Sequence, residues 1–144
     1  MTNATSTAAA THTLVVERDL THPPQKIWRA LTESSLIQQW LMRNDFQPST
    51  GHAFQLRMDP MPGWNGIIDC KVLTVDPPHR LAYTWSSMGL DTLVTFTLQP
   101  TSTGTHLRME QSGFASDTDA NYKGASYGWQ SFLTKLETVV SSLD

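Results

Sequence analysis

The side chains that most often move protons or bind metal ions are spread over this chain without a recognisable pattern. The chain has five histidines and thirteen carboxylates, but no two histidines have the close helical spacing of a zinc protease, and none lies beside a carboxylate in a metal-binding motif. A glycine-rich phosphate loop and a nucleophile elbow are also missing. We therefore expect no catalytic constellation, no metal site and no cofactor, and we expect the histidines on the surface.

Four other polar side chains are expected to reach the interior: Arg18, Tyr83, Gln111 and Tyr122. Arg18 shares a predicted strand face with two apolar residues, so its guanidinium needs a partner once it leaves water. We favour a structural carboxylate for that partner over an anionic group of a ligand. The two tyrosines and Gln111 are the groups that could act as an acid or a base if the protein were an enzyme.

The elements that position these groups follow from the spacing of apolar residues. Alternation predicts a first strand over 13–20, and Pro24 then suits the start of a short helix that runs to about Thr32. Ser35 and Gln38 have the capping-box spacing of a second short helix. Five later strands, separated by turn residues, are predicted over 54–58, 66–72, 81–85, 94–98 and 107–111.

The last quarter of the chain predicts one long amphipathic helix. From Tyr122 onward, large apolar residues recur at spacings of three and four for about six turns, which places them on one face. Gly124 and Gly128 lie side by side at the edge of this face. Because a glycine in a helix costs about 1 kcal/mol relative to alanine, they indicate a close approach to something on that side. Asp117 and Asp119 place negative charge where the helix is expected to begin.

These elements predict an α+β fold. A curved antiparallel sheet of about six strands would wrap around the long C-terminal helix, with two short helices between the first and second strands. Residues 1–12 are mostly small and polar, lack the apolar segment of a secretory signal, and are expected to form a flexible tail. The domain should span 13–144, and the space between sheet and helix is the candidate site.

Several short motifs along the chain match a known superfamily. They are Arg18, the run Pro24 to Thr32 with Ile27-Trp28, Leu36 with Trp40, Asp76-Pro77-Pro78-His79-Arg80-Leu81 followed by Tyr83-Thr84-Trp85, Gln111-Ser112-Gly113-Phe114, and Gly128-Trp129. In these residues and in its order of elements, the chain resembles the START-like (SRPBCC) superfamily of Bet v 1-like helix-grip proteins. Within that superfamily it resembles the activator of heat shock protein 90 ATPase homologues, over nearly the whole length from Thr13 to Leu143.

The resemblance implies a protein built around a cavity. Members of the superfamily bind lipids, steroids, plant hormones or polyketides, and some are cyclases. The family position before Ser-Gly-Phe that often holds a histidine is Gln111 here, which argues against an acid or base role at that point. The eukaryotic activators have a separate amino-terminal chaperone-binding domain that no part of this chain fits, so a chaperone partner is disfavoured.

Tryptophan and methionine are the residues expected to shape such a cavity. They suit a pocket that accepts varied apolar molecules, although each one could equally fill an ordinary core. The candidate ligand-binding residues are Arg18, Trp40, Met58, Trp64, Tyr83, Trp85, Phe96, Met109, Gln111, Tyr122, Trp129 and Phe132. An empty apolar cavity of about 300 Å³ would cost about 7 kcal/mol, so the pocket should be collapsed, wetted by polar groups or filled. The segment 59–65 is either a lid over it or a plain surface connection.

Composition excludes several partners. The net charge is −3 with no basic block, which excludes nucleic acid, and no apolar run is long enough to cross a membrane. A single cysteine, Cys70, excludes an internal disulfide and fits a reducing compartment, so the cytoplasm is the expected location.

Three functions remain open at this point. The first is binding of a small, mostly apolar ligand without catalysis, with that molecule as the expected partner. The second is an enzyme of the cyclase, aromatase or dehydratase kind that uses the same cavity, and the third is a co-regulator of a chaperone ATPase. A homodimer is left open.

Overall fold

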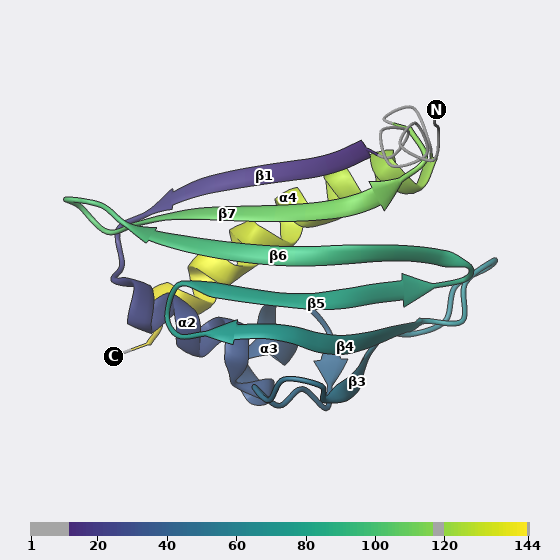
Figure 1. The fold of residues 1–144 in the computed structure, drawn as a ribbon, viewed down its shortest axis with the longest axis horizontal. Coiled ribbons are helices and arrows are strands. Elements are labelled where there is room, and N and C mark those ends of the chain that lie inside the picture. The colour runs from purple at the N-terminus through teal and green to yellow at the C-terminus, as the bar shows by residue number, and fades with distance from the viewer. Residues whose placement is uncertain (1–11, 117–119, 144) are drawn as a thin grey trace, which may run out of the picture.

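The computed structural model describes residues 12–116 and 120–143, and these form an α+β fold. The elements in chain order are β1 (His12–Leu20), α2 (Pro24–Thr32), α3 (Ser34–Trp40), β2 (Arg43–Asn44), β3 (Ala53–Arg57), β4 (Ile67–Asp76), β5 (Arg80–Ser87), β6 (Leu90–Pro100), β7 (Thr105–Phe114) and α4 (Ala120–Ser141). The predicted helix-grip arrangement is confirmed, with two short helices between β1 and β2 and a long last helix (Figure 1). Residues 1–11 of the predicted tail and the predicted helix-start residues Asp117 and Asp119 lie outside the described residues.

The strands of the described residues form one antiparallel sheet in the order β1-β7-β6-β5-β4-β3-β2. From β2 to β7 each strand pairs with the next along the chain, while β1 pairs with β7 and forms the other edge. The register of β4 against β5 shifts between Val72 and Thr74, and irregularities of this kind bend a strand and increase its twist. β2 has only two residues, too few for alternation to reveal, so the sequence predicted about six strands where the sheet has seven.

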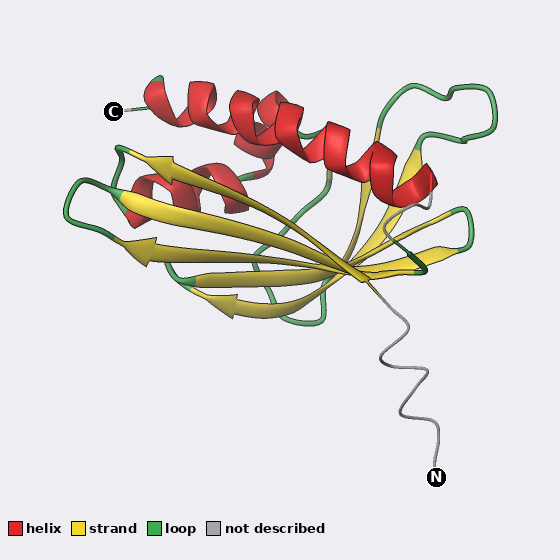
Figure 2. Ribbon diagram, turned by 90° about the horizontal axis from the view of Figure 1, so that it is seen from above, coloured by secondary structure: helices red, strands yellow, loops and turns green. Residues whose placement is uncertain are grey.

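One face of the curved sheet packs against α4, as Figure 2 shows. Inward strand residues predicted by alternation, such as Leu107 and Met109 of β7, are fully buried. The buried residues of α4 are Trp129, Leu133, Leu136, Val139 and Val140. Their three-and-four spacing is what turns one side of the helix toward the sheet.

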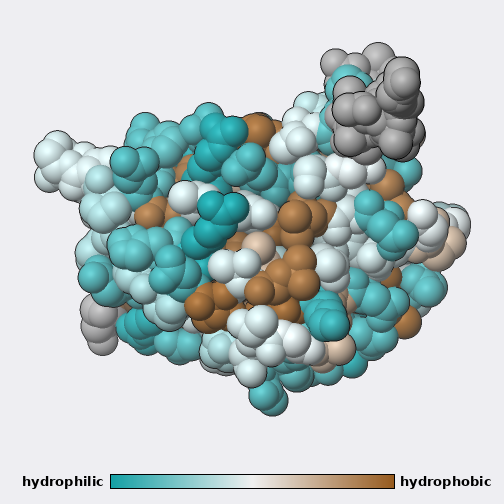
Figure 3. Space-filling view, in the orientation of Figure 1, coloured by the Kyte–Doolittle hydropathy of each residue, from teal (hydrophilic) through white to brown (hydrophobic). Residues whose placement is uncertain are grey.

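In the part of the chain that the structure describes, no helix covers the other face of the sheet (Figure 2). In Figure 3, which shows the side where the strands lie in front of α4, this surface is mostly hydrophilic, with a few apolar side chains gathered near its middle. Such a one-sided sheet is why the strands alternate between apolar and polar residues.

The two short helices fill only one end of the layer between sheet and α4. Both α2 and α3 contact α4, and they lie toward its C-terminal end (Figures 1 and 2). Trp40, the last residue of α3, is buried there and its indole Nε1 donates a 2.8 Å hydrogen bond to the carbonyl oxygen of Ala30. Within the described residues, no helix covers the other end of α4, and this is where the cavity described below opens.

The predicted capping box of α3 is wrong. The helix begins at Ser34, two residues earlier than a capping box on Ser35 requires, and its N-cap residue Glu33 makes no side-chain capping bond. The Ser34 hydroxyl donates instead to the side-chain oxygen of Asn44 at 2.8 Å, so it ties the start of α3 to β2.

Candidate functional site

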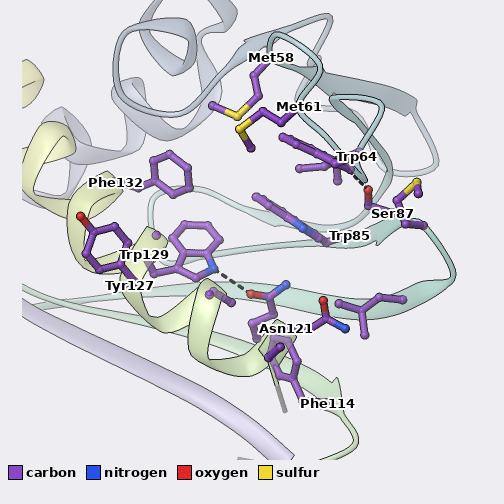
Figure 4. Close-up of a pocket in the computed structure, with 18 of the residues that line it drawn as sticks. Met58, Met61, Trp64, Trp85, Ser87, Phe114, Asn121, Tyr127, Trp129 and Phe132 are labelled. Atoms are coloured by element: carbon purple, nitrogen blue, oxygen red, sulfur yellow. Dashed lines mark hydrogen bonds between the residues drawn. The ribbon is translucent and has the colours of Figure 1, made fainter. Parts of the chain in front are cut away.

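A cavity of about 680 Å³ lies between the N-terminal half of α4, the inner face of the sheet and the loop between β3 and β4. Trp129 and Phe132 project into it from α4, Trp85 from β5, and Met61 and Trp64 from the loop (Figure 4). Its size falls within the range of roughly 300–1,000 Å³ that ligand-binding pockets occupy.

At the floor of the cavity, a series of hydrogen bonds joins α4 to the inner face of the sheet. The indole Nε1 of Trp129 donates to Gln111 Oε1 at 2.8 Å, and Gln111 Nε2 donates to Thr92 Oγ1 at 2.9 Å. Thr92 Oγ1 in turn donates to the carbonyl oxygen of Trp85 at 2.8 Å. Gln111 is only 2% exposed, and both ends of its amide are occupied, the oxygen by the indole of Trp129 and the nitrogen by Thr92.

Aromatic rings pack around Trp129 and hold it in place. Its ring centroid lies 5.3 Å from that of Trp85, 5.7 Å from that of Phe132 and 5.8 Å from that of Phe96. Each edge or tilted contact of this kind contributes about 0.5–1.5 kcal/mol beyond the area it buries. Trp129 is therefore both a wall of the cavity and part of the core.

The loop between β3 and β4 is fastened to the sheet beside the cavity. Trp64 Nε1 donates to Ser87 Oγ at 2.8 Å, and Ser87 Oγ donates to the carbonyl oxygen of Ile67 at 2.9 Å. The backbones of Met61 and Trp64 exchange two hydrogen bonds, of 3.0 and 2.9 Å, across the tip. The segment that was expected to be either a lid or a plain connection thus supplies a fixed wall.

Gly66 sets the approach of this loop to the sheet. Its φ is +80°, and a Cβ placed on it would lie 2.2 Å from the carbonyl oxygen of Met58. Because no side chain fits there, only glycine allows Met58 N to donate to Gly66 O at 2.9 Å.

Exposed apolar side chains surround the mouth of the cavity. Met61 is 55% exposed, Met88 65% and Tyr127 81%. Solvent therefore reaches the cavity, and the cost expected for an empty, closed apolar void does not arise.

The described residues that line the cavity carry no formal charge. None of the described residues around the cavity is an aspartate, glutamate, lysine, arginine or histidine, and Tyr127 is the one titratable side chain among them. Across the described residues there is also no group of three or more potential metal ligands. The arrangement can hold an apolar molecule, but it presents little with which to move protons.

The structure brings together half of the predicted site residues. Those that line the cavity are Met58, Trp64, Trp85, Gln111, Trp129 and Phe132. Those that do not line it are Arg18, Trp40, Tyr83, Phe96, Met109 and Tyr122.

Arg18 lies away from the cavity. Its Nη2 donates to Gln130 Oε1 at 2.7 Å and its Nη1 to the carbonyl oxygen of Glu17 at 3.0 Å. The expected carboxylate partner is wrong because the side chain reaches over the edge strand β1 to α4, where an amide meets it in a partly exposed position.

Most of the other predicted site residues that do not line the cavity belong to the core behind it. Tyr83 packs with Phe54 at a centroid distance of 5.2 Å and with Phe96 at 6.0 Å. Burial raises the pKa of the Tyr83 phenol well above its ordinary value, so this group stays neutral. Trp40 meets Phe96 edge-on at 6.3 Å. Tyr122 packs against Phe114 at 5.4 Å, on α4 but outside the cavity lining.

Some lining residues were not proposed as site residues from the sequence. Ile68 lies on the buried face of the strand predicted over 66–72, and alternation along that strand could have identified it. Leu90 and Phe114 come to the cavity from the ends of β6 and β7. Near Phe114 the alternation breaks at Gly113, whose φ is +113°.

The two glycines of α4 do not serve the expected close approach within the protein. Among the described residues, a Cβ on Gly124 would meet nothing within 4 Å, and one on Gly128 would meet only Phe132 Cε2, at 3.7 Å. Both line the cavity. Each glycine thus costs the helix about 1 kcal/mol relative to alanine, and no other element of the described chain approaches closely in return.

A seven-stranded antiparallel sheet curved around a long C-terminal helix, with a cavity between them, defines a helix-grip protein of the START-like, Bet v 1-like class. The family model described as "Activator of Hsp90 ATPase homolog 1-like protein" matches residues 21–141. The chain belongs to this family.

Solved structures share this fold. Protein MLL2253 from Mesorhizobium loti is 50% identical with a TM-score of 0.85, and the match covers 92% of this chain and 99% of that one. Protein BH1534 from Bacillus halodurans is 26% identical with a TM-score of 0.76, over 90% of this chain and 96% of that one. Protein CV1439 from Chromobacterium violaceum, at 24% identity, a TM-score of 0.72 and coverage of 89% and 96%, shows the likeness of fold alone. No curated protein matches the sequence.

In the described part of the chain, no helix combines the length and apolar character needed to cross a membrane.

Proposed function

We propose that this protein binds a small, uncharged, mostly apolar molecule in the cavity beside α4 and does not change it chemically. The observation that carries the proposal is the combination of an open mouth with a lining of tryptophan, phenylalanine and methionine that holds no formal charge among its described residues. Apolar surface of this kind gains about 25 cal/mol per Å² when a ligand removes it from water. An ionised ligand would lose its hydration there without finding a counter-charge.

The same lining argues against the cyclase-type alternative. Such an enzyme needs an acid or a base that reaches the substrate. Of the three groups considered for that role, Tyr83 is in the core, Tyr122 lies outside the lining, and the Gln111 amide does not titrate near neutral pH. We accordingly propose a binding protein rather than an enzyme.

We propose the small molecule as the physiological partner and the cytoplasm as the location, in which the buried free thiol of Cys70 stays reduced. The family name refers to activation of a chaperone ATPase. We rank that role below the binding of a small molecule, and stimulation of a chaperone ATPase by the purified chain would contradict this ranking.

Two measurements test the proposal. Native mass spectrometry of the purified protein, repeated after denaturation, should reveal a small molecule that is released only on unfolding. Titration of ligand-stripped protein with the neutral dye N-phenyl-1-naphthylamine should give saturable fluorescence enhancement with one dye per chain. Failure of the stripped protein to bind this dye or any other neutral apolar probe would overturn the proposed function.

A further inference from the structure

The cavity wall contributed by α4 has two positions without a side chain. Gly124 and Gly128 are one turn apart in a 22-residue helix, and both line the cavity. Glycine is the least favourable residue in a helix interior after proline, so its presence twice on one helical stripe calls for a physical cause.

The backbone does not require glycine at either position. Neither residue has a positive φ, unlike Gly66 and Gly113. Both adopt ordinary helical geometry within α4, which alanine forms more readily.

Packing within the protein does not require glycine either. As far as residues 12–116 and 120–143 are concerned, a Cβ on Gly124 would have open space around it, and one on Gly128 would make only an ordinary contact with Phe132. Gly104 shows what a required glycine looks like in this chain, because its Cβ would lie 2.0 Å from the carbonyl oxygen of Leu20.

What lies beside both glycines is the cavity itself. Trp129 and Phe132 stand on the same side of the helix and close the deep end, while Tyr127 stands at the mouth (Figure 4). At both positions the cavity wall has no side chain, so a bound molecule can lie directly against the helix backbone there.

We propose that Gly124 and Gly128 are the specificity-determining residues of this cavity, which set its width and so admit a broad, uncharged apolar molecule that lies against α4. The inference rests on the proposed function, because it assigns the size limit of the ligand that the cavity takes. Gly128 sets the width of the inner wall, and Gly124 sets the width of the mouth. A side chain at either position would narrow the cavity, and this would hinder the binding of a broad ligand more than that of a slim one.

The test compares two neutral probes of different breadth, N-phenyl-1-naphthylamine and naphthalene, on the full chain and on variants. Gly128→Leu and Gly124→Leu each add an isobutyl group to the cavity wall, and Gly128→Ala adds a single methyl group. Thr134→Leu is the matched control, because Thr134 is exposed on the same helix, does not line the cavity, and its hydroxyl donates to the carbonyl oxygen of Gln130 in the preceding turn. Probe affinity is read by fluorescence, and folding by the thermal midpoint.

We expect Gly128→Leu and Gly124→Leu to weaken N-phenyl-1-naphthylamine binding at least tenfold and naphthalene binding less than threefold, with thermal midpoints at or above that of the wild type. Gly128→Ala should raise the midpoint and weaken only the broad probe, and Thr134→Leu should bind both probes as the wild type does. Unchanged affinity for the broad probe in both leucine variants would overturn the inference while leaving the proposed function intact. Absence of any probe binding by the wild type would instead overturn the proposed function, so the two failures are distinct. If one leucine variant does not fold, the other and Gly128→Ala still decide the question.

Discussion

The indole N–H of Trp129 on α4 donates a 2.8 Å hydrogen bond to the side-chain carbonyl of Gln111 on β7. This bond joins the long helix to the inner face of the sheet at the floor of the cavity, and both residues are almost completely buried. Because a buried polar group without a partner is costly, the pair fixes both the orientation of the indole and the position of the helix above the sheet.

Gln111→Leu should lower the free energy of unfolding by about 1–3 kcal/mol, since it leaves the indole N–H of Trp129 buried without an acceptor. Urea denaturation measures the change, and Gln99→Leu at an exposed position of β6 is the control. Trp129→Phe removes the orphaned donor, so the double variant should be less destabilised than the sum of the two single variants. Additive effects would show that the hydrogen bond does not couple the residues.

Met88 is expected to lower the free energy of unfolding and to strengthen ligand binding at the mouth of the cavity. It forms the two-residue turn between β5 and β6 with Gly89, at φ values of 51° and 85°, and a methionine in this left-handed region is unfavourable. Met88→Asn should raise the free energy of unfolding by about 1 kcal/mol. It should also weaken binding of N-phenyl-1-naphthylamine severalfold, because an apolar side chain leaves the mouth of the cavity.

Met88→Leu is the control for that change, since it keeps an apolar side chain in the same backbone conformation and should bind the dye nearly as the wild type does. Urea denaturation and dye titration are run on all three proteins. Equal dye affinity in Met88→Asn and the wild type would mean that this rim residue does not contact the ligand.

His106 should make the stability of the β1–β7 edge dependent on pH. Its Nδ1 lies 2.7 Å from Asp19 Oδ1 and its Nε2 lies 2.6 Å from Glu17 Oε2, while Arg108 also faces Glu17 at 3.7 Å. The hydrogen bonds to Asp19 and then to Glu17 raise the pKa of His106 above its ordinary value of 6.5. A group whose pKa is raised by folding stabilises the protein at pH values below its ordinary pKa. This contribution disappears as the pH rises through the raised pKa.

The thermal midpoint of the wild type should therefore exceed that of His106→Gln by more at about pH 5.5 than at about pH 8.5. The difference should shrink in about 1 M salt, because the cluster is partly exposed and open to screening. A difference that is the same at both pH values would contradict the assignment of the effect to the imidazolium.

The sequence was a good guide to the elements because their periodicity is local. Alternation placed Leu107, Met109 and Gln111 on the inner face of β7, and the three-and-four spacing around Trp129 predicted the buried side of α4, as the structure shows. The motifs around Gln111 and Trp129 also indicated the family before any contact was known. Each of these signals depends on neighbours within a few turns or strand residues.

The location of the cavity on the inner face depended on tertiary structure. Tyr83 and Trp85 are two residues apart on the same side of β5, yet the first lies in the core and the second lines the cavity. They differ because α2 and α3 cover one end of α4 and leave the other end open, a fact that no alternation pattern contains. Arg18 was misplaced for a related reason, since its partner comes from α4, far along the chain.

The glycines of α4 show most clearly what the sequence determined and what only the tertiary structure decided. The sequence by itself determined the α+β helix-grip fold, the inward faces of the strands, and the fact that Gly124 and Gly128 carry an unusual cost in a long helix. Only the tertiary structure decided that, among the described residues, the missing side chains leave open space and do not let another element pack closely against the helix. The physical reason is that a periodicity fixes which way a side chain points, whereas the distance to whatever it meets depends on how separate elements dock.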